Sequence, residues 1–174
     1  MTAYCRDFTV GGTWFFTVNL ADRQRTLLVD HIDLLRQSFR HVMQAHPFKI
    51  NAIVVLPEHL HAIWTLPEGD ADYSLRWRLI KTGFSRGIAR GERISASRLT
   101  RGERGIWQRR YWEHLIRDDA DFARHLDYIH FNPVKHGHVH RVQDWLWSSF
   151  HRYVVDGEMD LEWGAGNGEG VFGE

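Results

Sequence analysis

A chain of 174 residues, 43% of them hydrophobic and 25% charged, is long enough to bury one globular core. The single cysteine, Cys5, excludes an internal disulfide and a cysteine-based zinc cluster, and a formal net charge of zero gives the molecule as a whole no attraction to polyanions. Because no apolar stretch approaches the ~18 residues that span a bilayer and no signal peptide is recognisable, we expect a soluble, cytoplasmic protein.

The first 66 residues predict a strand, a helix and a hairpin. An aromatic, β-branched run at 13–19 predicts a buried strand. Apolar residues recur at helical spacing over 27–46, and Pro47 ends that helix. Two further strands, 48–56 and 59–66, are separated only by a Pro-Glu turn, so we expect them to pair as a hairpin.

His59 and His61 open the second strand of this hairpin. Side chains alternate along a strand, so the two imidazoles point to one face while Leu60 enters the core. Two residues of strand span roughly 6.5–7 Å, and rings at that spacing can lean onto one metal ion. A bare His-x-His is also frequent by chance, so two histidines without a ligand are the alternative.

The middle of the chain carries the basic charge. We predict a helix over 73–89, a loop rich in Arg, Gly and Ser over 90–105, and a strand over 106–116. From 76 to 110 there are eleven basic residues against two acidic ones, whereas 156–174 holds six acidic residues and no basic one. This segregation indicates a polyanionic partner, and a solvated basic face without a function is the alternative.

Aromatic residues lie among these basic ones, a combination that suits single-stranded DNA because unpaired bases stack on rings. Alternation along 106–116 places Trp107 and Tyr111 on one face and Trp112 on the other, and leaves open which face is outside. The residues that we expect to bind DNA are Arg78, Lys81, Arg86, Arg109, Arg110 and Trp112.

The last predicted helix begins at Asp118 or Asp119 and ends at Asn132, ahead of Pro133. Beside its apolar face runs a polar stripe of Asp121, His125, Tyr128 and Asn132. Alone, Tyr128 would be an ordinary half-buried tyrosine. A phenol with a pKa of about 10 is a poor nucleophile, but a metal ion that polarises a phosphodiester would make its attack feasible.

The predicted order is therefore strand, helix, strand, strand, helix, strand, helix. This order is typical of an α+β fold, a ferredoxin-like split βαβ antiparallel sheet with helices packed on one face. We see no second domain. We expect one domain over residues 1–153, followed by an acidic, irregular tail over 154–174.

Five stretches, taken in this order, resemble a known family. The His-hydrophobe-His form of 59–61 is that of the HUH endonucleases, and together with one helical tyrosine it resembles the single-tyrosine transposases. The closest resemblance is to the REP-associated tyrosine transposases of bacteria, and it covers roughly residues 4–153. The stretches that carry it are 11–19, 55–70, 106–114, 127–137 and, more weakly, 144–153. The loop 91–105 is longer than we expect in such proteins, and the acidic tail matches nothing.

The resemblance implies a role for four residues. His59 and His61 match the metal ligands, and Asn132 lies where relatives place a third, polar ligand. Tyr128 matches the tyrosine that attacks the scissile phosphate and leaves a 5′-phosphotyrosine and a free 3′-hydroxyl. The implied ion is Mg²⁺ or Mn²⁺, although imidazole ligands favour Mn²⁺ and later metals over Mg²⁺.

The resemblance also implies the DNA substrate. It is single-stranded DNA with a hairpin of the repetitive extragenic palindromic (REP) type, cut beside the stem. For the protein itself we expect a monomer or a homodimer, associated with the bacterial nucleoid. Two other functions stay open. A domesticated protein would bind DNA hairpins without cleaving them, and a metal-dependent phosphodiesterase would use water as its nucleophile, with Tyr128 merely structural.

Overall fold

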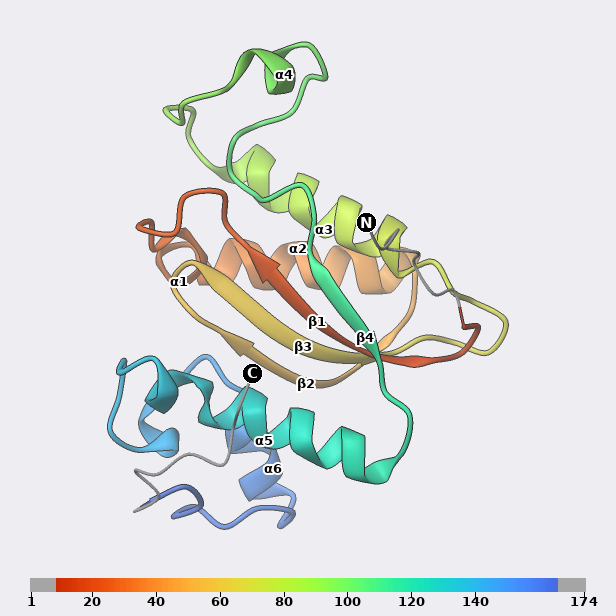
Figure 1. The fold of residues 1–174 in the computed structure, drawn as a ribbon, viewed down its shortest axis with the longest axis vertical. Helices are drawn as coiled ribbons and strands as arrows, with labels where there is room; N and C mark the ends of the chain where they lie inside the picture. The colour runs from red at the N-terminus through yellow and green to blue at the C-terminus, as the bar shows by residue number, and fades with distance from the viewer. Residues whose placement is uncertain (1–8, 166–174) are drawn as a thin grey trace, which may run out of the picture.

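One four-stranded antiparallel sheet, in the order β2-β3-β1-β4, organises the computed structural model, which describes residues 9–165. The strands are β1 (Thr13–Asn19), β2 (Lys49–Val55), β3 (His59–Thr65) and β4 (Trp112–Leu115) (Figure 1). The predicted hairpin is confirmed, since β2 and β3 pair antiparallel. The strand order is that of a split βαβ sheet, so the predicted α+β fold is confirmed.

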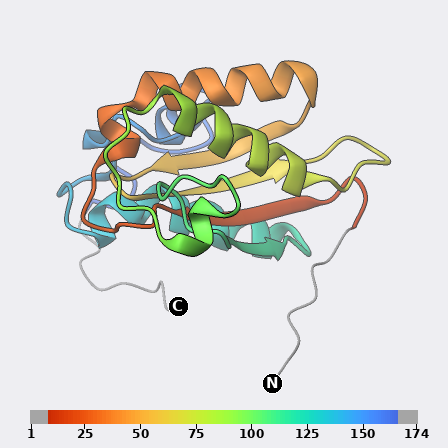
Figure 2. The ribbon, with the colours of Figure 1, turned by 90° about the horizontal axis from the view of Figure 1, so that it is seen from above.

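Helices cover both faces of the sheet, so our expectation of helices on one face is wrong (Figures 1 and 2). One face carries α1 (Leu27–Asp30), α2 (Ile32–Ala45) and α3 (Tyr73–Gly87). The opposite face carries α5 (Asp119–Lys135), followed by the 3-10 helix η1 (Val142–Asp144) and α6 (Phe150–Val155). The short helix α4 (Ala96–Leu99) lies in the loop after α3.

Helices pack on both faces of the sheet because the strands carry apolar side chains on both faces. Trp14 and Phe16 of β1 point towards α2 and α3, where Trp64 of β3 stacks on Trp77 with ring centroids 4.1 Å apart. Phe15 of β1 points the other way and packs in a second cluster together with Ile129 of α5. His59 and His61 alternate with Leu60 and Ala62 of the first cluster, so both lie on the α5 face.

Three predicted boundaries are wrong. His31 divides the predicted helix 27–46 into α1 and α2. The strand expected over 106–116 is only four residues long, because just Trp112–Leu115 finds a continuous partner in β1, while Trp107 makes an isolated bridge to Leu20. Helix α5 continues through Pro133 to Lys135, since a proline in the last turn removes only one of the helical hydrogen bonds.

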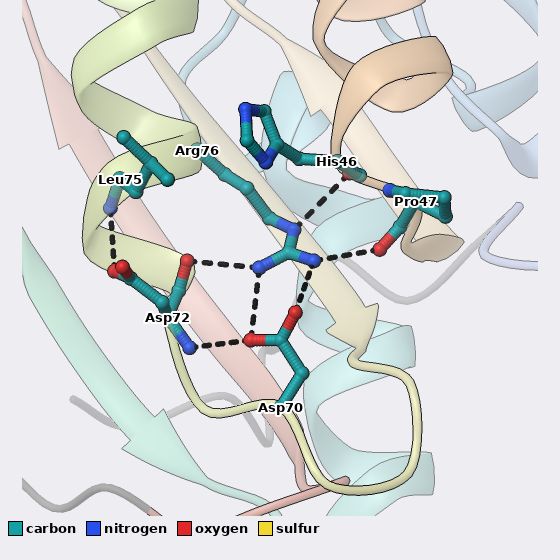
Figure 3. A network of polar contacts seen from close by, with 6 residues as sticks. All are labelled: His46, Pro47, Asp70, Asp72, Leu75 and Arg76. Carbon is teal, nitrogen blue, oxygen red and sulfur yellow. Dashed lines mark hydrogen bonds and ion pairs between the residues drawn. The ribbon is translucent and has the colours of Figure 1, made fainter.

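Arg76 counts towards the basic stretch but is a buried structural residue, 2% exposed (Figure 3). Its guanidinium donates to the carbonyl oxygens of His46, Pro47 and Asp72 at 3.2, 2.8 and 2.9 Å, and to both carboxylate oxygens of Asp70. These hydrogen bonds also hold the pKa of Asp70 below its usual value. They fasten the start of α3 to the end of α2, so Arg76 has no donor left for DNA.

The loop between α3 and β4 is anchored by Arg104. Its guanidinium donates to the carbonyl oxygens of Ser85 and Ile88, which lie at the carboxyl end of α3, and pairs with Glu92. Arg98 donates to the carbonyl oxygens of Arg104 and Trp107 at 2.8 and 3.0 Å. Arginines that sequence alone assigns to a basic loop therefore also build that loop.

The segment after α6 consists of turns up to Ala165, and residues 166–174 lie outside the described part. Within the expected tail, the Trp163 ring contacts Phe131 of α5 and Phe150 of α6 with centroids 6.5 and 6.2 Å apart. Among residues 9–165, no helix combines the length and the hydropathy that a membrane crossing requires.

Candidate active site

His59 and His61 form a buried pair on β3. Each is 3% exposed, and their ring centroids are 4.9 Å apart. His59 donates Nδ1–H to the Glu58 carboxylate over 2.8 Å, and His61 Nδ1 is hydrogen-bonded to the Thr17 hydroxyl over 2.8 Å. An imidazole that donates its Nδ1–H keeps the Nε2 lone pair for a ligand. Glu58 and Thr17 therefore hold the two rings in fixed orientations, and each ring has its Nε2 lone pair available to a ligand when Nδ1 carries the proton.

Burial keeps both imidazoles neutral. It lowers the pKa of His59 to about 4, against the pull of the Glu58 carboxylate. Burial, with the neighbouring His59, lowers the pKa of His61 well below its usual value. A metal binds only the neutral ring, so near neutral pH no proton has to leave before the metal is bound.

Helix α5 and its C-cap residue, His136, place three residues at helical spacing over the histidines. The Tyr128 ring meets the His61 ring edge-on with centroids 5.1 Å apart, and the His136 ring lies 5.2 Å from that of His59. Asn132 lies one helical turn from each, and residues four apart share a helix face. Tyr128, a member of the predicted polar stripe, therefore lies directly against His61.

Three buried polar atoms in this place lack a hydrogen-bond partner among residues 9–165: His61 Nε2, Asn132 Oδ1 and Asn132 Nδ2. Asn132 is entirely buried. A buried polar group without a partner costs about 1–3 kcal/mol, and native structures rarely leave one unexplained. An imidazole nitrogen and an amide oxygen that both lack partners fit a divalent cation, and they leave coordination positions open for phosphate.

His136 joins this site without having been singled out from the sequence. It continues the spacing of Tyr128 and Asn132, but the helix was expected to end before Pro133, which cut the stripe short. Lys135, the neighbouring residue, holds its Nζ 4.9 Å from the centroid of the Tyr128 ring. Periodicity would have found both residues had Pro133 been placed inside the last turn.

A second group of possible ligands lies on the same face, formed by His114, Asp121 and His125, whose ligand atoms are within 4.8 Å of one another. Here the side chains satisfy one another. His114 donates Nε2–H to the Asp121 carboxylate over 2.8 Å, and His125 donates Nδ1–H to the Asp121 carbonyl oxygen over 2.9 Å. These polar atoms already have partners, whereas His61 Nε2 and the Asn132 amide do not. The pair of His61 and Asn132 is therefore the better candidate for a metal site.

The residues expected to bind DNA divide between the two faces of the sheet. Arg78, Lys81, Arg86 and Arg109 line an open cavity of about 980 Å³ between α3 and the loop that contains α4. Arg110 is exposed but does not line it. Trp112 lies on the other face, with its ring edge-on to Phe15 at 5.5 Å. The structure thus answers which face of the 106–116 segment is outside, since Trp107 is buried and Trp112 half exposed.

Two proteins of known sequence and one solved structure match almost the whole chain or all of it. No model of a protein family matches it. A REP-associated tyrosine transposase of Escherichia coli K12 is 48% identical over 94% of this chain and 91% of its own length. A protein of Haemophilus influenzae assigned to the same family is 47% identical over 94% of each chain. A solved structure of a REP-associated tyrosine transposase bound to a REP hairpin superposes with a TM-score of 0.82 at 46% identity, covering 100% of this chain and 98% of that one.

Proposed function

This chain belongs to the REP-associated tyrosine transposases, and on that premise we propose that it cuts and rejoins single-stranded DNA next to REP-type hairpins through Tyr128. The observation that carries the proposal is the contact of the Tyr128 ring with His61, beside buried ligand atoms that have no partner among the described residues. A phenol, two neutral imidazoles and a buried amide are the groups that metal-assisted attack on a phosphodiester needs.

His59, His61 and Asn132 would hold a divalent ion, Mg²⁺ or Mn²⁺. When bound, the ion polarises the scissile phosphodiester and neutralises charge that develops on its oxygens. The imidazole ligands favour Mn²⁺ over Mg²⁺ at a site of this composition. Glu58 and Thr17 would keep the imidazoles oriented, and Asn132 would offer its buried amide oxygen from α5.

Tyr128 supplies the nucleophile. Its phenolic oxygen loses its proton and forms a bond to phosphorus, while the bond from phosphorus to the 3′ oxygen of the preceding nucleotide breaks. That 3′ oxygen gains a proton, and a 5′-phosphotyrosine remains. Attack by another 3′-hydroxyl reverses these bonds, rejoins a strand and frees Tyr128. The ammonium group of Lys135, held over the Tyr128 ring, stabilises the negative charge of the phenolate and of the phosphate.

The arginine-lined cavity would bind the phosphates of the hairpin. The side chains of four of its arginines, Arg78, Arg86, Arg90 and Arg101, form no ion pair or hydrogen bond within residues 9–165. Lys81 and Arg109 are partly engaged, by the carbonyl oxygen of Gln108 and by Glu103. Because one chain supplies one tyrosine, a monomer suffices for nicking, whereas two cleavages in one reaction would require a homodimer.

A covalent-adduct assay tests the proposed function. The protein is incubated with Mn²⁺ or Mg²⁺ and with hairpin DNA that carries a single-stranded 5′ flank and a label at its 3′ end, and the products are separated on a denaturing protein gel. We expect a labelled adduct that requires metal and is absent from Tyr128→Phe. Tyr153→Phe is the matched control, because Tyr153 donates its hydroxyl hydrogen to Asn51 away from the site and should still form the adduct.

The other outcomes identify the alternative functions. Cut DNA without any adduct would indicate water as the nucleophile and a structural Tyr128. Hairpin binding without cleavage in either metal would indicate a protein that recognises DNA structure without cutting it.

A further inference from the structure

Trp112 is an exposed aromatic ring at the start of β4, the edge strand next to β1. It is 50% exposed, although buried aromatic rings fill the rest of the sheet. Its ring is parallel to that of His114, at 2° with centroids 5.8 Å apart. His114 in turn stacks on His125 of α5, at 19° with centroids 4.8 Å apart. We call this row of three rings the β4 stack.

Hydrogen bonds at the ring edges fix the two histidines of the β4 stack. The buried Asp121, 4% exposed, accepts from His114 Nε2–H and from the backbone N–H of Arg117. His125 donates to the Asp121 carbonyl oxygen. Trp112 packs on these fixed rings, parallel to His114 and edge-on to Phe15, so a planar group can cover its outer face with little further ordering of the stack.

The β4 stack adjoins the nucleophile. Phe15 lies beneath it, and its ring contacts Trp112 and His125 at 5.5 and 4.6 Å and the Tyr128 ring at 6.0 Å. One phenyl ring thus separates Trp112 from Tyr128. Three exposed arginines lie close to the stack in the sequence, at 110, 117 and 124, and Arg124 donates to the Asp121 carboxylate at 3.2 Å. Cationic side chains are therefore available to a phosphate that follows a stacked group.

We propose that the β4 stack binds one unpaired nucleobase next to the scissile phosphate, with the base lying on the face of Trp112. The proposal rests on the proposed function and adds to it the position of a nucleotide. Every base has a π-face, so an aromatic surface suits a single strand drawn towards Tyr128. A second copy of this chain is the competing occupant, but the exposed arginines at 110, 117 and 124 favour a polyanion over an uncharged apolar surface.

The test replaces bases one at a time by 2-aminopurine, whose fluorescence falls when it stacks. The DNA is a REP-type hairpin with a single-stranded flank, and the protein carries Tyr128→Phe so that no strand is cut. We expect strong quenching at one or two positions beside the cleavage site. Trp112→Ala should abolish that quenching and weaken binding of the flanked hairpin about tenfold, while Trp112→Phe should restore most of both.

Leu146→Ala is the matched control, because Leu146 is a 72% exposed apolar side chain outside the stack, and quenching should be unchanged. Quenching that persists in Trp112→Ala would overturn the proposal. A change of oligomeric state in Trp112→Ala, measured by sedimentation without DNA, would overturn it in favour of self-association. The adduct assay separates this proposal from the function. If Trp112→Ala abolished the quenching and Tyr128→Phe still cleaved DNA, the base-binding site would be supported and the tyrosine mechanism refuted.

Discussion

At the scale of single residues, Asn132 is the most informative position in the structure. Its amide is fully buried, and neither amide atom has a partner among residues 9–165. A fold that keeps such a group in its core loses stability for it, by about 1–3 kcal/mol. A bound metal ion would give the amide oxygen a partner and account for this loss. Replacing Asn132 with an apolar residue should therefore raise the stability of the metal-free protein and weaken metal binding.

Asn132→Leu tests this expectation. In EDTA the variant should be more stable than the wild type, because it replaces an unsatisfied amide with an apolar side chain of similar volume, and each kcal/mol corresponds to about 2–4 °C in Tm. Mn²⁺ should raise the Tm of the wild type and leave that of the variant nearly unchanged. Thermal unfolding with and without metal measures both effects.

Asn51→Leu is the matched control for that measurement. Asn51 lies on the edge strand β2, and its Nδ2 donates to the Thr65 hydroxyl over 2.8 Å, so its amide is partly satisfied, and its replacement should leave the response to Mn²⁺ intact. An Asn132→Leu protein that is less stable in EDTA and still responds to Mn²⁺ would show that the amide has an ordinary structural role.

Lys135 should act on the reaction and not on binding. Its Nζ lies 4.9 Å from the centroid of the Tyr128 ring, so Lys135→Met should slow adduct formation at saturating DNA about tenfold, near 1.4 kcal/mol of barrier, with little change in hairpin affinity. Lys135→Arg should retain most of the rate. Single-turnover kinetics separate the two quantities, with Lys49→Met, an exposed lysine on the far edge strand, as the control. Equal losses of rate in both variants would count against the role of Lys135.

At the scale of elements, local patterns were predicted well and pairings between distant segments were not. Period-two alternation correctly placed His59 and His61 on one face, because alternation is a property of one strand. The strand expected over 106–116 shrank to Trp112–Leu115, since its length depends on how much of β1 is left to pair. The placement of α5 on the second face depended on Phe15 and Ile63, whose direction a buried, unbroken apolar run does not reveal.

In the candidate site, too, the local patterns were predicted and the contacts between distant segments were not. The histidine pair and the polar stripe of α5 follow from spacing, whereas the roles of Tyr128 and Asn132 came from the family resemblance. His136 was missed because Pro133 was taken as the end of the helix. The hydrogen bonds of Thr17 to His61 and of His114 to Asp121 join segments far apart in the chain or in different elements, so only the fold could show them.

The loop between α3 and β4 should detach in acid before the sheet unfolds. Hydrogen bonds from Arg104 lower the pKa of Glu92 to about 2, from an ordinary value of 4.5. A carboxyl group with a lowered pKa contributes stability that is present above pH 4.5 and is lost as the pH falls towards 2. Hydrogen exchange of residues 90–105 should therefore accelerate over that range while β1 and β3 stay protected.

The Glu92→Gln substitution removes the negative charge of this side chain at neutral pH, as acid does in the wild type. Because the neutral amide pairs weakly with Arg104, trypsin should cleave the loop at its arginines several times faster than in the wild type. Glu103→Gln, which removes the exposed partner of Arg109, should have a smaller effect. Equal cleavage rates in wild type and Glu92→Gln would mean that Arg104 anchors the loop through carbonyl oxygens alone.

At the scale of the whole molecule, the sheet separates the residues proposed to cleave DNA from those proposed to bind the hairpin. Tyr128 and the histidines lie on the α5 face, whereas the arginine-lined cavity lies beside α3, on the other side. The edge strand β4 lies between them, with Arg110 just before it and Trp112 at its start. A hairpin held in the cavity would send its single strand around this edge to reach Tyr128.

This division predicts that binding and cleavage can be changed separately. Arg78→Ala combined with Arg86→Ala should lower the salt dependence of hairpin binding by about one to two units of slope, because each lost phosphate contact removes roughly 0.7–0.9. The rate of adduct formation at saturating DNA should stay near that of the wild type. Arg40→Ala, an exposed arginine on α2, is the control. An unchanged slope would exclude the cavity as the hairpin site.

The central claim, that Tyr128 becomes covalently joined to DNA, is tested most directly by mass spectrometry of the reacted protein. The wild type is incubated with single-stranded hairpin DNA and Mn²⁺, the DNA is trimmed with nuclease, and the protein is digested with trypsin, which releases residues 125–135 as one peptide. We predict that this peptide gains the mass of a 5′-phosphonucleotide and that fragmentation places it on Tyr128. Cleaved DNA with an unmodified peptide, or with the nucleotide on another tyrosine, would contradict the account.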